Sequence, residues 1–308
     1  MKQPGDDPFP RAPRGVKLAA MAFAIVAHSS SETNLALASA WRAGECYGVL
    51  GPREALGFLG GGDTALARLD VRRSLDGVEP GLSDLVEMER RGVRVLNRPE
   101  ALLAGHDKLL TARLLENGGV ATPRTVFVGD DWSELDSLLP LVVKPRFGSW
   151  GADVFCVQDE SELRRLAREL AGRSWLARGG AIAQELIPSL GFDLRVLVAR
   201  GVVVGAVRRR ASDGEWRMNV SCGARRIAET VEPRAARLAL EAVEMTCLDL
   251  AVVDIMPLPG GGFCALEVNA APDFGLDYNA EKNVFLAVIE QLEPAAAINS
   301  RLSVLDAA

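Results

Sequence analysis

Histidine is almost absent from this sequence, which has only His28 and His106 among its 308 residues. The five cysteines are scattered and include no C-x-x-C pair: Cys46, Cys156, Cys222, Cys247 and Cys264. Because zinc sites are built from closely spaced His and Cys ligands, we do not expect a zinc site. An odd number of isolated cysteines also argues against a disulfide framework and favours a reducing compartment, so we expect a cytoplasmic protein.

Long apolar runs and an excess of positive charge are missing as well. No stretch approaches the ~20 apolar residues of a membrane-spanning helix. The net charge of -6 offers no basic stripe to a nucleic acid. We therefore expect neither a membrane nor a nucleic acid as partner. Basic residues before the apolar run 18–27 imitate an export signal, but small residues alternate in this run and a helix start follows it, so we interpret it as the first buried strand.

With 48% hydrophobic and 25% charged residues, the chain can bury a large core and is expected to split into two or three lobes. Residues 1–15 are polar and rich in Pro and Gly, which indicates a loose tail. The first strand is followed by a helix that begins at a capping box, Ser29 and Glu32, and ends at Gly44.

A second strand at 47–50 completes a strand, helix, strand order, which predicts a small α/β domain with a parallel sheet over residues 16–97. Residues 51–83 are rich in loops, and we place no strand in them. A short helix at 82–90 and a strand at 93–96 are expected to complete this domain.

Helical patterns follow Pro99 and stop at the paired glycines 118–119, with Lys108 in the first turn of the second helical piece. Strands are then expected at 124–128, 141–144, 153–157, 182–187, 193–198 and 202–208, and helices at 161–171, 233–245 and 280–292. A strand-rich middle with helices on one side predicts an α+β fold. We expect one lobe over residues 98–187 and a second lobe over residues 188–308.

The most informative stretch is 251–272, where two apolar runs flank a Pro/Gly connection and predict an antiparallel hairpin. With the turn centred in that connection, Asp254 lies opposite Glu267 on one face, which Asn269 joins two residues later. Three oxygen donors, with no basic residue inside the hairpin, suit Mg²⁺ bound together with substrate phosphates. The alternative is an exposed hairpin edge decorated with acids.

A phosphate-binding loop is expected after the apolar strand that ends at Lys144. The glycine-rich sequence that follows contains Gly148, Ser149, Trp150 and Gly151. Backbone amides in such a turn can point together at an anion, and the lysine supplies positive charge. It is not a P-loop, because the G-K-[ST] order is absent and a strand follows. The alternative is a plain hairpin with two turn glycines.

A site for a purine base is expected where Gln184, Glu185, Leu186 and Ile187 end a buried strand. A purine needs an apolar slot with backbone donors and acceptors at its edge, and a strand that leaves the core offers both. Asp193 follows shortly and can accept hydrogen bonds from ribose hydroxyls. The alternative is that these are structural polar residues at a strand end.

Arginine is the side chain best suited to clamp phosphate or carboxylate oxygens. Five polar candidates end the strand at 202–208 or follow it: Arg208, Arg209, Arg210, Arg217 and Asn219. A solvated run of charges is the alternative, and we prefer it for Arg208. Arg195 lies between two apolar residues and must reach a partner, because a lone buried arginine is costly.

The order of these motifs resembles the ATP-grasp superfamily. The motifs are Lys108, Lys144, the glycine-rich hairpin, QELI at 184–187, D-x-R at 193–195, RRA-x-x-G-x-x-R-x-N at 209–219, VVDI at 252–255 and EVNA at 267–270. The chain is most similar to the branch that contains the ribosomal protein S6 glutamate ligase, the LysX ligases and the glutamate ligases of pterin cofactors. The resemblance covers residues 97–292.

This resemblance implies an ATP-grasp fold, in which two α+β lobes grip ATP and a small α/β pre-ATP-grasp domain precedes them. The implied nucleotide contacts are Lys108 and Lys144 at the phosphates, Glu185 and Leu186 beside the adenine, Asp193 at the ribose, and Arg217 and Asn219 against phosphate and metal.

The resemblance also implies a metal site and a set of charges on the reacting groups. Asp254, Glu267 and Asn269 would hold Mg²⁺ or Mn²⁺, and Glu267 would bridge two ions. Arg209, together with Arg210, would stabilise the phosphoryl group or an acyl phosphate. Arg217 would act beside them.

The implied activity is that of an ATP-dependent carboxylate-amine ligase, which forms an amide through an acyl phosphate and joins glutamate or a similar amino acid to a small-molecule or cofactor-precursor amine. One alternative is a ligase that modifies a protein or carrier-protein tail. Alternatives of another class are an ATP-grasp phosphotransferase and a non-catalytic nucleotide-binding protein. Family members are commonly dimers or tetramers, so a homo-oligomer is expected.

Departures from the branch concern the second substrate. The branch often has Ser-Pro-Gly after EVNA, whereas this chain has Ala271, Pro272 and Asp273. Cys222 stands where the S6 ligase commonly has a basic residue. These differences leave the implied ATP and metal residues intact and leave the acceptor open.

Overall fold

A four-stranded parallel sheet forms the N-terminal part of the computed structural model, which describes residues 21–129 and 132–293. Its strand order is β2-β1-β3-β4, with β1 (Phe23–Val26), β2 (Cys46–Leu50), β3 (Thr64–Ala67) and β4 (Arg94–Leu96). The helices between these strands are α1 (Glu32–Ala40), α2 (Pro52–Phe58) and α3 (Leu82–Arg90). Every residue of β1 and β3 is buried, as is typical of a parallel sheet covered on both faces.

Two local predictions in this sheet are wrong. Helix α1 is capped by Ser31, whose hydroxyl accepts a hydrogen bond from the backbone N–H of Asn34 at 3.3 Å. The carbonyl of Ser29 accepts from the side-chain amide of Asn34 at 2.7 Å, which places Ser29 before the cap. The helix then ends at Ala40 and not at Gly44.

Residues 51–83 contain α2 and β3, which the sequence did not reveal. Strand β3 has only four residues, TALA, too few for a clear alternation of apolar and polar side chains. The tail expected at 1–15 and the start of the strand expected at 18–27 lie outside the described residues.

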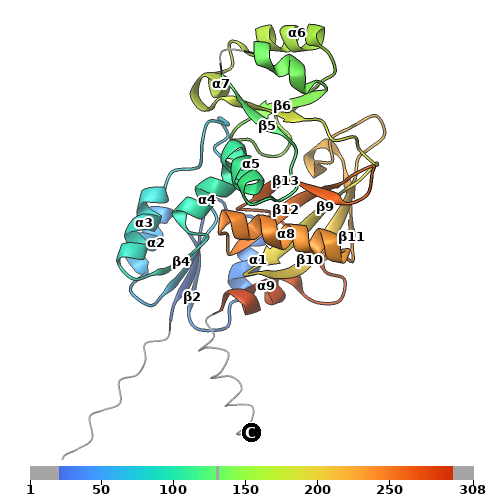
Figure 1. Cartoon of the computed structure of the whole chain (residues 1–308). Helices are drawn as coiled ribbons and strands as arrows, with labels where there is room; N and C mark the ends of the chain where they lie inside the picture. Colours follow the sequence, from blue (N-terminus) through green and yellow to red (C-terminus); the bar gives the residue numbers. More distant parts are fainter. Residues whose placement is uncertain (1–20, 130–131, 294–308) are drawn as a thin grey trace, which may run out of the picture.

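An antiparallel sheet of order β5-β8-β6-β7 forms an upper lobe (Figure 1). Its strands are β5 (Thr125–Val128), β6 (Leu141–Pro145), β7 (Phe155–Val157) and β8 (Ala181–Glu185). Helix α6 (Glu160–Leu170) buries Leu163, Leu166 and Leu170 in the core of this lobe, because residues three and four apart share one helix face. The unpredicted helix α7 (Ser174–Gly179) adds Trp175 to the same core. Helices α4 (Pro99–His106) and α5 (Lys108–Asn117) lead into the lobe.

The third sheet has five antiparallel strands in the order β11-β10-β9-β12-β13. They are β9 (Asp193–Ala199), β10 (Val202–Arg210), β11 (Arg225–Ala228), β12 (Leu250–Pro257) and β13 (Phe263–Asn269). Val196 and Val198 share a core with helix α8 (Pro233–Thr246), while Leu197 and Ala199 share one with helix α9 (Val284–Leu292) and the N-terminal sheet. Alternation along β9 thus buries both faces of this sheet.

Asn97 connects the N-terminal sheet to the five-stranded sheet. Its side-chain amide donates to the carbonyls of Leu250 and Ala270, at 2.8 and 2.9 Å. Its side-chain oxygen accepts from the backbone N–H groups of Asp249 and Leu250. The residue is fully buried and has a φ of 54°, a conformation that asparagine tolerates better than most residues. The domain boundary expected at 97/98, like that at 187/188, stays a prediction.

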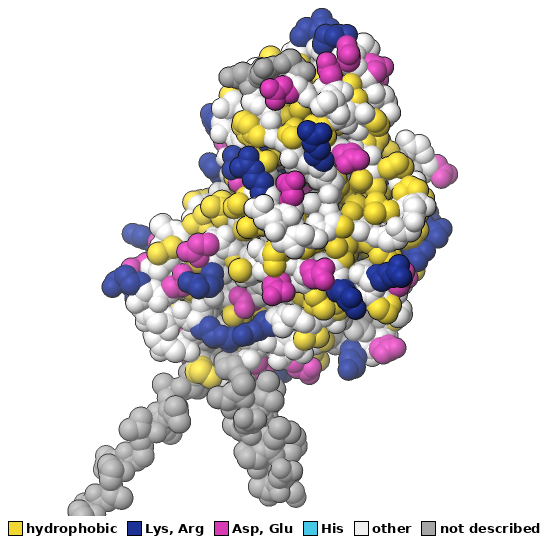
Figure 2. Space-filling model, viewed as in Figure 1, with side chains coloured by type: hydrophobic (Ala, Val, Ile, Leu, Met, Phe, Trp, Pro, Cys, Tyr) yellow, Lys and Arg dark blue, Asp and Glu magenta, His cyan; other side chains and the backbone are white. Residues whose placement is uncertain are grey.

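Acidic and basic side chains are interspersed over the face drawn in Figure 2, and apolar side chains gather where the upper lobe meets the body of the molecule. Within residues 21–129 and 132–293, no helix combines the length and the apolar character needed to cross a membrane.

Candidate active site

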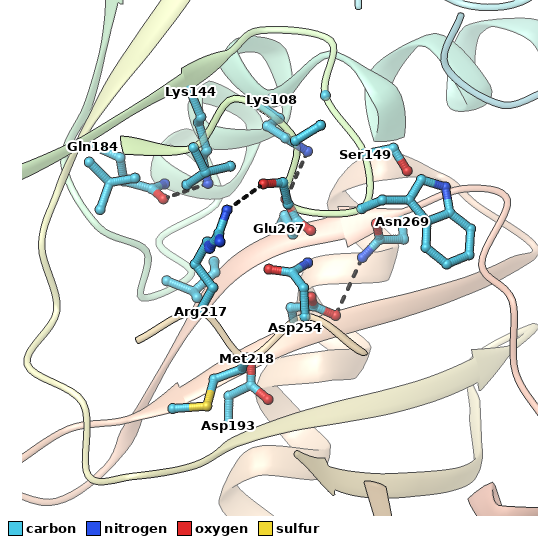
Figure 3. Close-up of a pocket in the computed structure, with 18 of the residues that line it drawn as sticks. Lys108, Lys144, Ser149, Gln184, Asp193, Arg217, Met218, Asp254, Glu267 and Asn269 are labelled. Carbon is cyan, nitrogen blue, oxygen red and sulfur yellow. Dashed lines mark hydrogen bonds and ion pairs between the residues drawn. The ribbon is translucent and has the colours of Figure 1, made fainter. Parts of the chain in front are cut away.

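A cleft of about 590 Å³ opens between the upper lobe and the five-stranded sheet. Its walls come from the start of α5, the β6–β7 loop, the end of β8, strands β12 and β13, and the segment 216–221 (Figure 3). Most of the predicted site residues line it: Lys108, Lys144, Gly148, Ser149, Trp150, Gly151, Gln184, Glu185, Leu186, Ile187, Asp193, Arg209, Arg217, Asn219, Asp254, Glu267 and Asn269. Segments far apart in the sequence therefore converge on one cavity.

The hairpin places its oxygen donors as the sequence predicted. Asp254 on β12 pairs directly with Glu267 on β13, and a bulge follows this pair. Asn269 lies two residues further along β13, and its amide donates to the Asp254 carboxylate at 3.4 Å (Figure 3). Because alternate residues of a strand share a face, all three side chains point into the cleft. The shared face of Asp254, Glu267 and Asn269 is therefore confirmed.

Two arginines from neighbouring strands neutralise Asp254, which the hairpin alone left without a basic partner. Arg195 on β9 contacts it at 3.1 Å, and Arg209 on β10 contacts it at 2.8 Å. Arg209 also forms a bidentate pair with Asp193, at 2.8 and 2.5 Å. Burial lowers the pKa of Arg209, but Asp254 and Asp193 outweigh it and raise that pKa overall. Asp254 is therefore the partner that Arg195 was expected to reach.

The second carboxylate, Glu267, faces two lysines. The ammonium of Lys108 lies 2.8 Å from the Glu267 carboxylate. Burial raises the pKa of Glu267, but Lys108 and Lys144 outweigh burial and hold it well below its usual range. Lys144 is buried and donates to the side-chain oxygen of Gln184 at 2.9 Å. Burial lowers the pKa of Lys144 to about 8, with Glu267 acting against that shift.

Local structure explains where these lysines lie. The Asp107 side chain caps α5 by accepting from the N–H groups of Leu109 and Leu110, so Lys108 stands at the helix start. Asp107 also pairs with Arg146, which directly follows β6. The N–H of Lys108 donates to the Arg146 carbonyl at 3.1 Å. These contacts hold α5 against the strand that carries the second lysine.

The glycine-rich loop closes over one side of the cleft. Arg217 donates to the carbonyl of Gly151 at 3.2 Å, and Ser221 donates to the carbonyl of Trp150 at 2.5 Å. Gly151 has a φ of 71°, and a Cβ there would come within 2.9 Å of the Asn219 side chain. The loop therefore requires glycine at this position, for both its backbone conformation and its close approach.

Apolar side chains also line the cleft and give it an apolar section: Val142, Val154, Leu186, Met218, Met256 and Leu266. This apolar section suits a flat base, as expected for residues 184–187. The N–H groups of Glu185 and Leu186 already donate to the carbonyls of Arg124 and Pro140, at 2.9 and 3.1 Å. A base would therefore meet the Leu186 carbonyl or side chain, not these two amides.

Three predicted site residues have surroundings that their predicted roles did not lead us to expect. Arg210 is exposed at the end of β10 and does not line the cleft. Both carboxylate oxygens of Asp193 accept from Arg209, so a ribose would have to compete with that pair. Arg217 is paired with Glu215 at 2.8 Å. Their proposed roles in catalysis and nucleotide binding stay predictions.

Sequence reasoning missed several residues of the cleft, among them Asp70, Trp216 and Asp273. Asp70 follows β3, in the segment where no strand was expected, and no local pattern marks it. A signal for the lysines was present but unused: the chain has five lysines, and two of them, Lys108 and Lys144, line the cleft. In an arginine-rich chain, lysine at a buried position indicates a need for a compact point charge.

The donor set fits a hard cation. Carboxylate and amide oxygens from Asp254, Glu267 and Asn269 meet on one face, and Mg²⁺ usually binds through one or two carboxylates plus substrate phosphates. Within the part of the chain that the structure describes, no three His, Cys, Asp or Glu side chains cluster as a metal cage. An ion here would therefore take part of its coordination from a bound substrate.

Comparison with known proteins agrees with this geometry. Residues 105–291 match the family model of the RimK-like ATP-grasp domain. A probable alpha-L-glutamate ligase of Xanthomonas campestris pv. campestris (strain 8004) is 32% identical over 222 residues, 70% of this chain and 75% of that protein. The ribosomal protein bS6--L-glutamate ligase of Shigella boydii serotype 4 (strain Sb227) is 32% identical over 198 residues, 62% of this chain and 64% of that protein.

A solved structure shows the same fold. The ATP-grasp ligase PsnB, complexed with a phosphomimetic variant of its minimal precursor, Mg and ADP, has a TM-score of 0.65 at 19% identity, over 91% of this chain and 99% of that chain. The predicted α+β, ATP-grasp architecture is therefore confirmed. The protein belongs to the RimK-like ATP-grasp family and is an ATP-dependent ligase that forms C–N bonds.

Proposed function

We propose that this ligase joins a carboxylate to an amine, with MgATP as the energy source and glutamate or a similar amino acid as one substrate. The observation that carries the proposal is the meeting of Lys108 and Lys144 with Glu267, opposite Asp254, in a single cleft. The names of the two glutamate ligases described above support the choice of amino acid. A small molecule is the proposed second substrate.

The two lysines bind the triphosphate in this proposal. Lys108 is paired with Glu267 at 2.8 Å, and a phosphate oxygen would compete for the same ammonium. That exchange makes the oxygens of Glu267 available to a metal ion. Mg²⁺, when bound, neutralises charge on the phosphate oxygens. Arg195 and Arg209 hold the Asp254 carboxylate in place, so Asp254 keeps its orientation toward the cleft.

The chemistry needs positioned charges and no protein nucleophile. The carboxylate of one substrate attacks the γ-phosphorus, which gives an acyl phosphate and ADP. An amine then attacks the acyl carbon, a C–N bond forms, and phosphate leaves. Lys108, Lys144 and Arg217 would offset the negative charge that builds up on the transferred phosphoryl group. The closed glycine-rich loop would limit access of water to the acyl phosphate.

The test is an assay of ADP release in which amino acids are screened against candidate partner substrates. Release that requires both an amino acid and a second substrate supports the ligase, and the product mass must show a new amide. Glu267→Gln is expected to lower kcat by about 10²-fold or more, because charge stabilisation of the phosphoryl group is lost. The matched control is Glu290→Gln, an exposed glutamate on α9, which should leave kcat unchanged.

The same assay separates the alternatives. A phosphotransferase would yield a stable phosphate ester and no amide. A non-catalytic binder would take up MgATP, release no ADP, and tolerate Glu267→Gln. A ligase for a protein tail would need a polypeptide as its second substrate, as the name of the bS6 ligase indicates for that relative. A rate of ATP turnover that does not change with any second substrate would contradict the ligase proposal.

Self-association is a further part of the proposal. Strand β11 is the edge of its sheet, and Ile227 on it and Leu276 beside it are both more than half exposed. An exposed apolar edge suits contact with a second copy of the chain. Light scattering is expected to give the mass of a dimer or tetramer. A cytoplasmic location is likewise proposed, supported by five cysteines that form no disulfide.

A further inference from the structure

A second cavity, of about 440 Å³, adjoins the ATP cleft on the side of the N-terminal sheet. The two cavities share several lining residues: Asp70, Val71, Ser149, Trp150, Ala152, Ala271 and Asp273. The glycine-rich loop and the segment after β13 therefore separate the cavities only partly. A molecule in the second cavity would lie next to the first cleft.

The second cavity lies at the switch point of the parallel sheet. Strand β1 has β2 on one side and β3 on the other, so the chain reverses its direction of winding between them. Ligands of open α/β sheets bind outside the carboxyl ends of the strands at such a point. Ser29, Ser31 and Asn34, at the start of α1, line the cavity there, and Arg68 follows β3.

Arg68 carries a buried positive charge that its partners compensate poorly. It is 4% exposed and donates to two neutral oxygens, those of the Asn34 side chain and the Pro272 carbonyl. Asp273 is the nearest carboxylate, at 3.8 Å, and the Nη1 atom has no hydrogen-bond partner among the described residues. Burial lowers the pKa of Arg68 to about 10, the opposite of the shift at Arg209. Arg68 therefore donates no hydrogen bond to an anion among the described residues, and its Nη1 atom is left unpaired.

Acidic side chains face the same space. Asp70 and Asp273 line both cavities, while Glu79 lines the second. The backbone of Asp70 is held by Glu79, whose carboxylate accepts from the Asp70 N–H at 2.9 Å. The preceding carbonyl, that of Leu69, contacts the His106 ring at 2.7 Å, which ties this segment to α4. Asp70 is thus fixed between the two cavities.

We propose that the second cavity binds a free α-amino acid, with Arg68 at its carboxylate and Asp70 at its ammonium, and that Asp70 removes the ammonium proton before the amine attacks. The inference rests on the proposed ligase function and adds that the amino acid supplies the amine. A buried guanidinium with an unpaired nitrogen, next to carboxylates, is complementary to a zwitterion. The shared wall at Asp70 directs the amine toward the ATP cleft.

Asp70 takes one proton from R–NH3⁺, and the resulting lone pair on nitrogen attacks the acyl carbon. The C–N bond forms as the C–O bond to phosphate breaks, and the leaving phosphate carries away the electron pair together with the second proton from nitrogen. Burial and Asp273 raise the pKa of Asp70, while the Val71 N–H, Arg68 and Lys108 act against that rise. The net upward direction makes Asp70 a better proton acceptor than an ordinary aspartate.

Binding of simple probes to the full chain, with Mg²⁺ and a non-hydrolysable ATP analogue, tests the two contacts. L-glutamate is compared by calorimetry with 4-aminobutyrate, which lacks the α-carboxylate, and with glutarate, which lacks the ammonium. Wild type is expected to bind glutamate at least about tenfold more tightly than either. Arg68→Lys should weaken glutamate about tenfold and leave 4-aminobutyrate unchanged, whereas Asp70→Asn should weaken glutamate and leave glutarate unchanged.

The outcomes separate this inference from the proposed function. If MgATP binds but none of the twenty amino acids does, or if both variants bind glutamate like wild type, the inference is wrong while the ligase stands. Absence of MgATP binding overturns the ligase itself. Should Arg68→Lys fail to fold, the three probes on wild type and on Asp70→Asn still decide the result. Glu54→Gln, an exposed change on α2, is the control.

A pH profile tests the proton transfer. Asp70→Asn is expected to lower kcat by about 10²-fold or more at neutral pH. Its rate should then rise about tenfold per pH unit, because the free amine must come from solution. Wild type should show a much flatter profile over the same range. A variant profile parallel to that of wild type would overturn the assignment of Asp70 as the proton acceptor.

Discussion

Neighbouring side chains compensate the buried charges of the cleft to different degrees. This difference indicates what each charged residue contributes. Arg209 has two carboxylate partners, so its charge is already compensated and it supports Asp254. Lys144 is buried with a neutral partner, Gln184, and only the more distant charges of Glu267 and Asp254 favour its protonated form. A buried cation with such partners gains most from an incoming phosphate.

Lys144 is expected to take up a proton when ATP binds in alkaline solution. Its pKa is about 8. At about pH 9 the amine is mostly neutral, and a triphosphate beside it restores the charged form. Calorimetry in buffers of different ionisation enthalpy should show this uptake, and little of it well below pH 8. Lys144→Arg should abolish the uptake because arginine stays charged, while the exposed Lys282→Arg should not. Equal uptake in both variants would contradict the assignment.

Arg209 is expected to matter for stability as well as activity. Arg209→Met leaves the buried carboxylates Asp193 and Asp254 without this partner, which costs about 3 kcal/mol or more in the free energy of unfolding. Arg210→Ala, at the next and exposed position of β10, should change that free energy by less than about 0.5 kcal/mol. Urea unfolding measures both. Equal stability of the two variants would show that Arg209 does not stabilise the cluster it forms with Asp193 and Asp254.

At the scale of elements, the β12–β13 hairpin and the glycine-rich loop form two opposite sides of the site. The hairpin is rigid because β12 pairs with both β9 and β13, and because every residue of β12 is buried. The loop depends on fewer contacts, chiefly those of Arg217 and Ser221 with loop carbonyls. Binding energy is therefore expected to be more sensitive to changes in the loop than to conservative changes in the hairpin.

Gly151→Ala is expected to raise the KM for ATP about tenfold, because the left-handed backbone costs an L-residue roughly 1–2 kcal/mol. The new Cβ would also lie within 2.9 Å of the Asn219 side chain and displace the loop. Gly172→Ala is the control, since that glycine has ordinary φ and no atom within 4 Å of the added carbon. Initial-rate kinetics measure both variants. An unchanged KM in Gly151→Ala would show that the loop does not contribute to ATP binding.

At the scale of the whole molecule, three sheets share cores, and a few buried polar residues set their relative position. Asn97 joins the end of β4 to β12 and to the residue after β13 through four side-chain hydrogen bonds. Arg68 reaches across to Pro272 in the same way. The β12–β13 hairpin and the second cavity are therefore positioned by the same connections.

Asn97→Ala is expected to reduce the free energy of unfolding by about 3 kcal/mol or more, because it leaves buried backbone groups of Leu250 and Ala270 and a partly buried N–H of Asp249 unsatisfied. Asn117→Ala, exposed at the end of α5, should stay within about 0.5 kcal/mol of wild type. Chemical denaturation followed by fluorescence measures both. A small effect at Asn97 would mean that the two sheets are held mainly by apolar packing.

Local patterns in the sequence were enough to predict the helices at α3, α4, α5 and α8 and nearly all strands after residue 120, each within a few residues. They also predicted that Asp254, Glu267 and Asn269 share a face, because register across a short hairpin depends only on the turn. The predicted start of α1 was wrong because consecutive serines offered more than one possible cap; Ser31 caps the helix, while the carbonyl of Ser29 accepts from the Asn34 side chain.

What the sequence by itself determined is therefore the family, the order of its elements and the residues that face one another across neighbouring strands. The tertiary structure alone decided which charges meet: Asp254 with two arginines from other strands, Lys108 with Glu267, and Arg68 beside Asp70 at the second cavity. The physical reason is the distance along the chain over which each interaction acts. Hydrophobic period and turn spacing act over a few residues, whereas ion pairs between sheets depend on how whole sheets pack.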